Sequence, residues 1–144
     1  KITRGCDEAQ AEAAIGGVGV ALDLTLRGLQ QQLKDKSLPW EKAKAFDGAC
    51  PISEFVSLDK VADLQQLGIQ LRHNSHMQQN GNSADMLTPV VPLLLYISQF
   101  FTLIPGDVVL TGTPAGVRPL AVGDQLEISL VDHVYCQTQV CAAG

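Results

Sequence analysis

A short apolar run leads into small and hydroxyl-bearing residues in the stretch Gly106-Asp107-Val108-Val109-Leu110-Thr111-Gly112-Thr113-Pro114-Ala115-Gly116-Val117. Residues 108–110 read as a fully covered strand. Thr111, Gly112 and Thr113 then offer two hydroxyls and accessible backbone N–H groups, which suit a carboxylate or an enolate oxygen. Pro114 fixes its φ angle and Gly116 permits a positive φ, so the loop is stiff at one point and free to turn at another. The stretch predicts a ligand-binding loop, with a plain strand and turn over a core as the alternative.

Length and composition are those of a single globular domain. The chain has 144 residues, of which 46% are hydrophobic and 17% charged, enough to build one core. Its formal net charge of −5 argues against nucleic acid and anionic membrane surfaces as partners, since both need a basic face. The charge does not exclude a small anionic metabolite. Residues 90–104 form the only long apolar run, which is too short to span a membrane and therefore predicts a buried helix.

The periodicity predicts a chain with many strands and few helices. A helix capped by Asp7 is expected to reach Ala14 or Ile15, and another helix is expected to start at Thr88-Pro89 and end near Phe101. The other expected elements are a strand at 18–26, a helix at 27–36, a loop at 37–51, a strand at 52–58, a hairpin at 67–79 turning near Asn74-Ser75, and strands at 108–111, 125–131 and 134–140. The four cysteines form no C-x-x-C pattern, which indicates reduced thiols.

Asp23 is the sharpest candidate for chemistry on residue type alone. It interrupts the apolar run 18–26, where a carboxylate would carry a heavy desolvation cost unless a cation or several donors met it. A metal ion would meet that need. The alternative is a carboxylate at a strand end that is solvated or capped. By contrast, His73 and His76 straddle the expected hairpin turn without a second ligand motif, so they do not predict a metal site.

Three further motifs occur together with the 106–117 stretch: Asp23-Leu-Thr-Leu-Arg-Gly-Leu-Gln30, Lys44-Ala-Phe-Asp47 through Cys50-Pro51, and Leu120-Ala-Val-Gly-Asp-Gln-Leu-Glu127. In these motifs and their order, over nearly all of its length, the chain resembles the fumarylacetoacetate hydrolase family. Within it, the chain is most similar to the small acylpyruvate hydrolase and oxaloacetate decarboxylase-like members. The resemblance implies a mixed α/β, β-rich fold, a distorted β-barrel or roll of sheets with a few short helices, and a homodimer.

The resemblance also implies roles for five residues. Asp23 would be a metal ligand, and an all-oxygen carboxylate set suits Mg²⁺ or Mn²⁺. Lys44 would be catalytic, because it can pair with a substrate carboxylate or stabilise negative charge on a carbonyl. Gln30, Gly112 and Thr113 would bind the substrate. Taken without the resemblance, Lys44 and Gln30 are typical of a solvated surface.

The family's His-x-Glu-x-Glu segment, which supplies two further metal-binding glutamates and part of a water-activating pair, is not among residues 1–144. We therefore expect a single domain that is incomplete at its N-terminus. The implied function is a cytoplasmic, metal-dependent hydrolase that cleaves a C–C bond in acylpyruvate-type β-diketo acids, with decarboxylation of oxaloacetate as a related activity. The alternatives are an isomerase or decarboxylase of ring-cleavage dicarboxylates, and a catalytically silent binding remnant without the glutamates.

Overall fold

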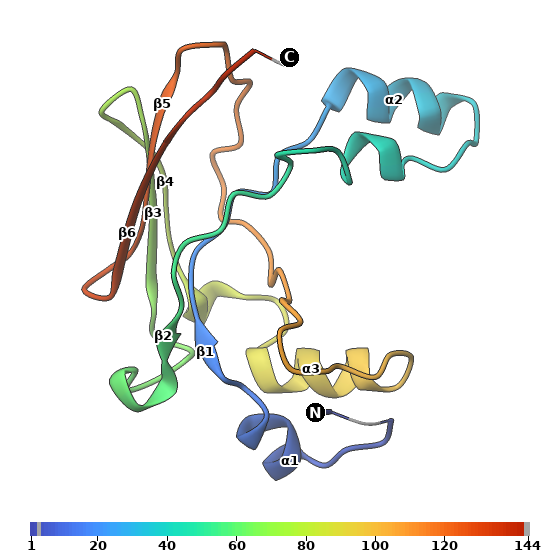
Figure 1. Ribbon diagram of the computed structural model, residues 1–144, viewed down its shortest axis with the longest axis vertical. Helices are drawn as coiled ribbons and strands as arrows, with labels where there is room; N and C mark the ends of the chain where they lie inside the picture. The colour runs from blue at the N-terminus through green and yellow to red at the C-terminus, as the bar shows by residue number, and fades with distance from the viewer. Residues whose placement is uncertain (3, 143–144) are drawn as a thin grey trace.

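The computed structural model describes residues 1–2 and 4–142, which form an open sheet on one side and short helices on the other (Figure 1). Helices α1 and α3 lie together at one end of the molecule, and α2 stands apart at the other end (Figure 1). The elements are α1 (Glu8–Ala13), β1 (Gly17–Val18), α2 (Arg27–Asp35), η1 (Glu41–Ala43), β2 (Val56–Ser57), η2 (Leu58–Lys60), β3 (Gly68–His73), β4 (His76–Asn82), η3 (Ser83–Asp85), α3 (Val90–Ser98), β5 (Gln125–Leu130) and β6 (Val134–Gln139). The predicted β-rich mixture of strands and short helices is confirmed.

The larger sheet is antiparallel throughout, in the order β4-β3-β5-β6. Its β3–β4 hairpin turns where the sequence predicts, with Asn74 at φ 50° and Ser75 at φ 68°. Both central residues of this two-residue turn have the left-handed conformation that matches the twist of the strands, although serine adopts it less readily than glycine. The predicted strands at 125–131 and 134–140 are confirmed as β5 and β6, each ending one residue early.

The main core lies against one face of this sheet. Leu126, Ile128 and Leu130 alternate with less buried residues along β5, as expected for a strand with one covered face. Val20 and Leu22 pack against them from the segment that follows β1. This packing places the segment containing Asp23 directly over the inner face of the sheet.

A second core joins α1 to α3, with Ile2, Ala11 and Leu94 buried together. Asp7 caps α1 as predicted, because its carboxylate accepts a hydrogen bond from the Gln10 N–H and the Asp7 N–H donates one to Gln10 Oε1. Helix α3 begins later and ends earlier than predicted. Pro89, rather than Thr88, occupies its cap position, and the helix ends at Ser98 before Phe101.

Three predicted strands are wrong in extent. Residues 108–111 form no strand, and Val108 and Leu110 are each 46% exposed, because no strand among the described residues pairs with them. The expected strand at 18–26 shortens to β1 and an isolated bridge at Ala21. The one at 52–58 shortens to β2 and a bridge at Ile52. The segments that carry them still run side by side: β1 and β2 pair as a two-stranded antiparallel sheet, and beyond it the only ladder contact among the described residues of these segments is the bridge between Ala21 and Ile52.

Helix length and the state of the cysteines are two further properties of the described part of the chain. None of its helices has the length and apolar character needed to cross a membrane. The four cysteines are free thiols, as predicted.

Candidate functional site

The backbone around Asp23 is fixed by hydrogen bonds to the segment 43–53. The N–H groups of Leu22, Leu24 and Leu26 donate to the carbonyls of Pro51, Ala49 and Ala43 at 2.9, 2.9 and 3.0 Å. In such an extended segment successive side chains point to opposite sides. Since Leu22 faces the core, Asp23 and Thr25 share the other side.

Lys44 meets both of these side chains. Its Nζ contacts Asp23 Oδ1 in an ion pair and donates to Thr25 Oγ1 at 2.9 Å. Its backbone is held at the end of η1, where the Lys44 N–H donates to the Glu41 carbonyl at 2.8 Å. Lys42, two residues earlier, is exposed. Of the two lysines, Lys44 is therefore the one directed toward Asp23.

Asp23 does not carry the predicted desolvation cost, because its side chain is 50% exposed and that of Lys44 is 27% exposed. The alternation of the segment puts the apolar side chains inward and the carboxylate outward. An ion pair this exposed contributes little to stability. The ion pair instead fixes position, because it holds the Lys44 ammonium and the Asp23 carboxylate together at the surface of a hollow.

The loop that carries Gly112 and Thr113 lies on strand β4. Gln79 Nε2 donates to Thr113 Oγ1 at 3.0 Å and to the Pro114 carbonyl at 2.7 Å. Gly112 has φ 122°, a conformation that residues with a Cβ rarely adopt, and a Cβ built there would have no atom within 4 Å. The backbone at Gly112 is thus open to close approach by a ligand.

All five predicted site residues line one hollow of about 2670 Å³, namely Asp23, Gln30, Lys44, Gly112 and Thr113. Gln30 reaches it from α2, where its N–H donates to the Leu26 carbonyl at 2.8 Å. Small-molecule sites typically occupy roughly 300–1,000 Å³, so a metabolite would fill only part of this space. The structure brings Asp23 into contact with Lys44. Gln30 and Thr113 share the hollow with that pair, but no hydrogen bond links them to it among the described residues.

Sequence reasoning missed Thr25, which holds Lys44, and Gln79, which holds Thr113. Thr25 could have been found from its spacing, because a residue two positions from Asp23 in an extended segment lies on the same side. Gln79 gave no signal, since glutamine on a strand is usually a solvated residue.

A third missed feature is the polar cluster around Asp124, which also joins β3 to the loop before β5. The carboxylate accepts hydrogen bonds from the Ala121 N–H at 2.7 Å and from the Asn74 amide at 2.8 Å. His73 Nε2 lies 2.8 Å from it, close in distance but poorly aligned for a hydrogen bond. Together, in that order of importance, these groups lower the pKa of Asp124 from 3.8 to about 2.

The residues that the structure describes do not make a metal site by themselves. They contain no group of three or more histidine, cysteine or acidic side chains placed to hold an ion. Asp23 fits as one ligand, since its carboxylate is half exposed and faces the hollow. One carboxylate is a small part of the six to eight oxygen ligands, or the octahedral set, that hard divalent ions take.

Residues 1–141 match the family model described as fumarylacetoacetate (FAA) hydrolase C-terminal. The chain is 49% identical over 131 residues to oxaloacetate tautomerase YcgM of Escherichia coli (strain K12), covering 90% of this chain and 60% of that protein. It is 38% identical over 130 residues to the mitochondrial oxaloacetate tautomerase FAHD1 of Homo sapiens, covering 90% and 59%. The chain thus spans about three fifths of the length of these curated relatives.

A solved structure of fumarylpyruvate hydrolase from Pseudomonas aeruginosa, in complex with Mn²⁺ and pyruvate, is similar to this fold. The TM-score is 0.90 at 30% sequence identity, and the match covers 99% of this chain and 62% of that one. This similarity confirms the predicted roll of sheets with few helices.

Proposed function

This chain belongs to the fumarylacetoacetate hydrolase family, and from that premise we propose that the whole protein is an enzyme that acts on small anionic 2-oxo acids through an enolate. The observation that carries the proposal is the placement of the Lys44 ammonium, which contacts Asp23 and Thr25 on the lining of the hollow that Gly112 and Thr113 also line. A cation and a set of hydrogen-bond donors then lie on the lining of the same wide hollow. That arrangement suits a substrate with a carboxylate and a keto group.

Lys44 would stabilise the negative charge that builds on the keto oxygen. An ammonium group has three donors. Asp23 and Thr25 take two of them, which leaves one for a substrate oxygen. Preorganised donors of this kind favour the transition state because charge develops where they already point.

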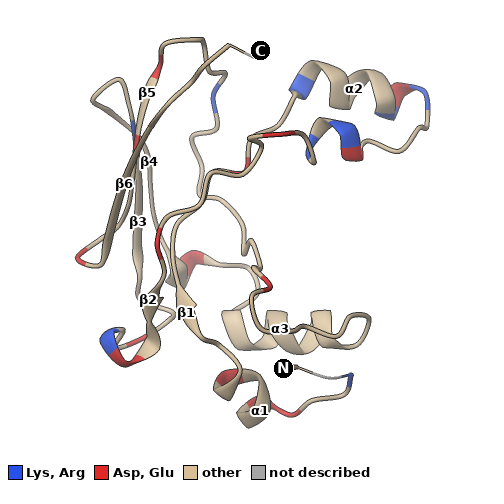
Figure 2. Cartoon of the chain, in the orientation of Figure 1, with Lys and Arg blue, Asp and Glu red and all other residues tan. Residues whose placement is uncertain are grey.

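Thr113 and Gly112 would bind the substrate carboxylate through a hydroxyl and accessible backbone N–H groups, and Gln30 would donate from α2. Lysine and arginine residues lie on α2 and η1, on the Lys44 side of the molecule, with acidic residues among them (Figure 2). Local cations favour an anionic ligand although the formal net charge of the chain is −5. We therefore keep a small anionic 2-oxo acid as the substrate class. That nucleic acid and membranes are not partners stays a prediction from the net charge.

We propose Mg²⁺ or Mn²⁺ as the cofactor, with Asp23 supplying one oxygen ligand alongside ligands from outside the described residues. The support is the carboxylate facing the hollow and the Mn²⁺ in the fumarylpyruvate hydrolase of Pseudomonas aeruginosa. When bound, such an ion supplies Lewis-acid polarisation of substrate oxygens. Asp23 would then serve two partners, the ion and Lys44.

Two reactions on 2-oxo acids are candidates. Tautomerisation of oxaloacetate, which sequence reasoning did not predict, is favoured by the names of the Escherichia coli and human relatives. Hydrolysis of an acylpyruvate C–C bond, the predicted reaction, is favoured by the fumarylpyruvate hydrolase. Both pass through an enolate next to a carboxylate, so the Lys44 and Thr113 roles serve either. A homodimer and a cytoplasmic location stay predictions.

The test uses the full-length protein with Mn²⁺ or Mg²⁺ and three readouts. Decay of the oxaloacetate enol absorbance reports tautomerisation, pyruvate release reports decarboxylation, and loss of acetylpyruvate absorbance reports C–C hydrolysis. We expect metal-dependent turnover in at least one readout. Absence of turnover in all of them would contradict the proposal and favour a silent binding domain.

A further inference from the structure

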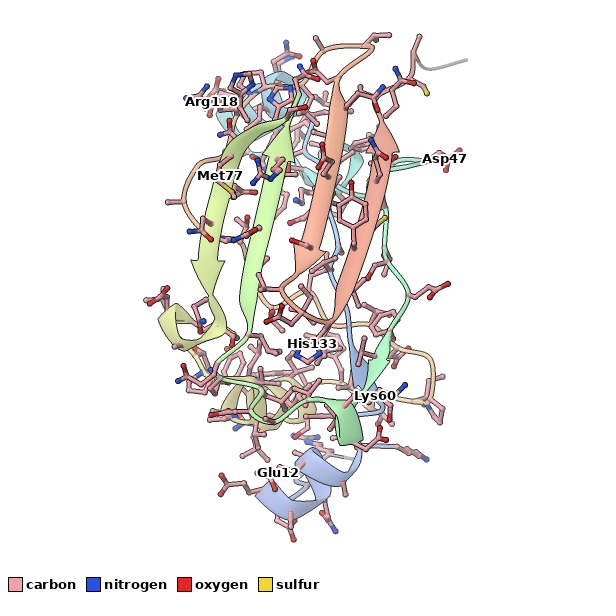
Figure 3. All side chains as sticks on the ribbon, turned by 90° about the vertical axis from the view of Figure 1, so that its left-hand side faces the viewer. Glu12, Asp47, Lys60, Met77, Arg118 and His133 are labelled. Atoms are coloured by element: carbon pink, nitrogen blue, oxygen red, sulfur yellow. The ribbon has the colours of Figure 1, made fainter. Side chains whose placement is uncertain are left out.

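Strand β4 holds the loop 112–116 through close contacts at several points. A Cβ built at Gly81 would lie 2.7 Å from Pro114 Cβ, and one at Gly116 would lie 2.3 Å from the Gln78 carbonyl oxygen. The Gln78 side chain donates to the Gly116 carbonyl. Figure 3 shows the strand face on, with Met77 on β4 and Arg118, just beyond the loop, near the same edge of the sheet. Residues 104–124 contain no helix or strand, so contacts of this kind, and not a sheet ladder, hold the loop that carries Thr113.

The orientation of the Gln79 amide within these contacts is determined by its partners. The Pro114 carbonyl can only accept, so the group 2.7 Å from it must be the NH₂ and not the amide oxygen. The same nitrogen lies 3.0 Å from Thr113 Oγ1. Its two hydrogens suffice for both bonds. Thr113 Oγ1 is therefore an acceptor toward Gln79.

This leaves the hydroxyl hydrogen of Thr113 available. A hydroxyl has one hydrogen and two lone pairs, and Gln79 uses a lone pair. Among the described residues the hydroxyl's own acceptor is the Pro114 carbonyl at 3.5 Å, which is too long for a strong bond. Thr113 is exposed on the lining of the hollow. Its hydrogen can turn to an anionic oxygen placed there.

We infer that Gln79 is a positioning residue, which anchors the 112–116 loop and keeps the Thr113 hydroxyl as a hydrogen-bond donor to the carboxylate of the substrate. The inference rests on the proposed function for its substrate class. It adds a residue outside the loop and outside the Asp23–Lys44 pair. Gln79 would act through Thr113 and not on the reacting atoms.

The test compares Gln79→Leu and Gln79→Glu with Gln70→Leu in the full-length protein. Gln70 is the matched control because it is also a strand glutamine, and it donates to the Asn80 side chain at 3.2 Å instead of to the loop. We expect Gln79→Leu to raise KM for the 2-oxo acid roughly 10-fold, the effect of one hydrogen bond to a charged group. Because the lost contact is to the non-reacting carboxylate, kcat should change less than about threefold.

Gln79→Glu separates orientation from mere packing. The introduced carboxylate has the size of the amide but can only accept, so it would be repelled by the Pro114 carbonyl and would take the Thr113 hydrogen. Its KM should exceed that of Gln79→Leu. In a Thr113→Val background, Gln79→Leu should raise KM by less than about twofold further, since coupled residues are not additive. A full additional increase, or an equal effect of Gln70→Leu, would overturn the inference.

Amide hydrogen exchange over residues 110–118 gives a readout without catalysis. Faster exchange in Gln79→Leu than in wild type and Gln70→Leu is expected, and unchanged exchange would overturn the inference. If the wild-type protein turned over no 2-oxo acid, the proposed function would fail, and the exchange result would still decide whether Gln79 anchors the loop.

Discussion

The Lys44 ammonium contacts the Asp23 carboxylate across 21 positions of the chain. It also donates to Thr25 Oγ1 at 2.9 Å. Asp23 and Thr25 come from an extended segment whose alternate residues form the core, and Lys44 comes from the end of η1. The contact thus couples the main core to the lining of the hollow.

Loss of the Lys44 charge should impair chemistry more than stability. We expect Lys44→Met to lower kcat by roughly 10²–10³-fold, the usual cost of removing one preorganised electrostatic group. The melting temperature should change little, because the ion pair is exposed. Steady-state kinetics and thermal unfolding measure the two effects. Lys42→Met is the matched control, and equal losses in both variants would contradict the role of Lys44.

Removal of the Asp23 charge should weaken metal binding. Asp23→Asn is expected to lower Mn²⁺ affinity by at least about 10-fold, since even outer partners of metal ligands have effects of that size. Isothermal titration calorimetry on the full-length protein measures it. Asp47→Asn is the control, because it changes an exposed carboxylate near the site and should leave the Mn²⁺ affinity unchanged. An Asp23→Asn protein that binds Mn²⁺ as wild type would show that the ligand assignment is wrong.

A methyl group added at Gly81 should displace the loop that carries Thr113. The new Cβ would lie 2.7 and 2.8 Å from two atoms of the Pro114 ring, so the loop must shift. We expect kcat/KM to fall on the order of 10- to 100-fold, as for other small misplacements of site residues. Gly28→Ala in α2 is the control, because its Cβ would meet no atom within 4 Å. Gly28→Ala should instead raise the free energy of unfolding by about 0.5–1 kcal/mol.

The Asp124 cluster should make stability depend on pH in acid. The folded pKa of about 2 lies below the ordinary 3.8. The unfolded chain therefore binds the proton first, so the contribution of Asp124 is complete above about pH 4 and is lost as the pH falls to about 2. Asp124→Asn should lower the melting temperature at pH 7 and flatten its dependence between pH 4 and 2. Asp132→Asn, in the β5–β6 turn at φ 64°, should leave that dependence unchanged.

The sequence predicts elements best where the residue pattern alone decides them. Leu126, Ile128 and Leu130 alternate with more polar residues and identify β5, and Asn74-Ser75 marks the hairpin turn. The run Val108–Leu110 is apolar enough for a strand, yet in the described chain no partner strand pairs with it, and sequence does not contain that information. Apolar content predicts burial only when another element is present to cover it.

In the candidate site, too, some features follow from the sequence pattern and others depend on contacts between distant segments. Residue types and a family resemblance identify Asp23 and Lys44, but no spacing rule brings together residues 21 positions apart. Asp23 is exposed because Val20 and Leu22 point into the core, and alternate residues of an extended segment share a side. The sequence could have predicted this from the apolar residues at positions 20 and 22. Gln79 could not be found in this way, because its role depends on where an irregular loop settles on β4.

A structure of the full-length protein with Mn²⁺ and pyruvate tests the central claim most directly. The account predicts the ion at the Asp23 carboxylate, the pyruvate carboxylate at the Thr113 hydroxyl and the Gly112 backbone, and the Lys44 ammonium at the keto oxygen. Pyruvate bound elsewhere in the hollow, with Asp23 in contact only with Lys44 and Thr113 bare, would contradict it.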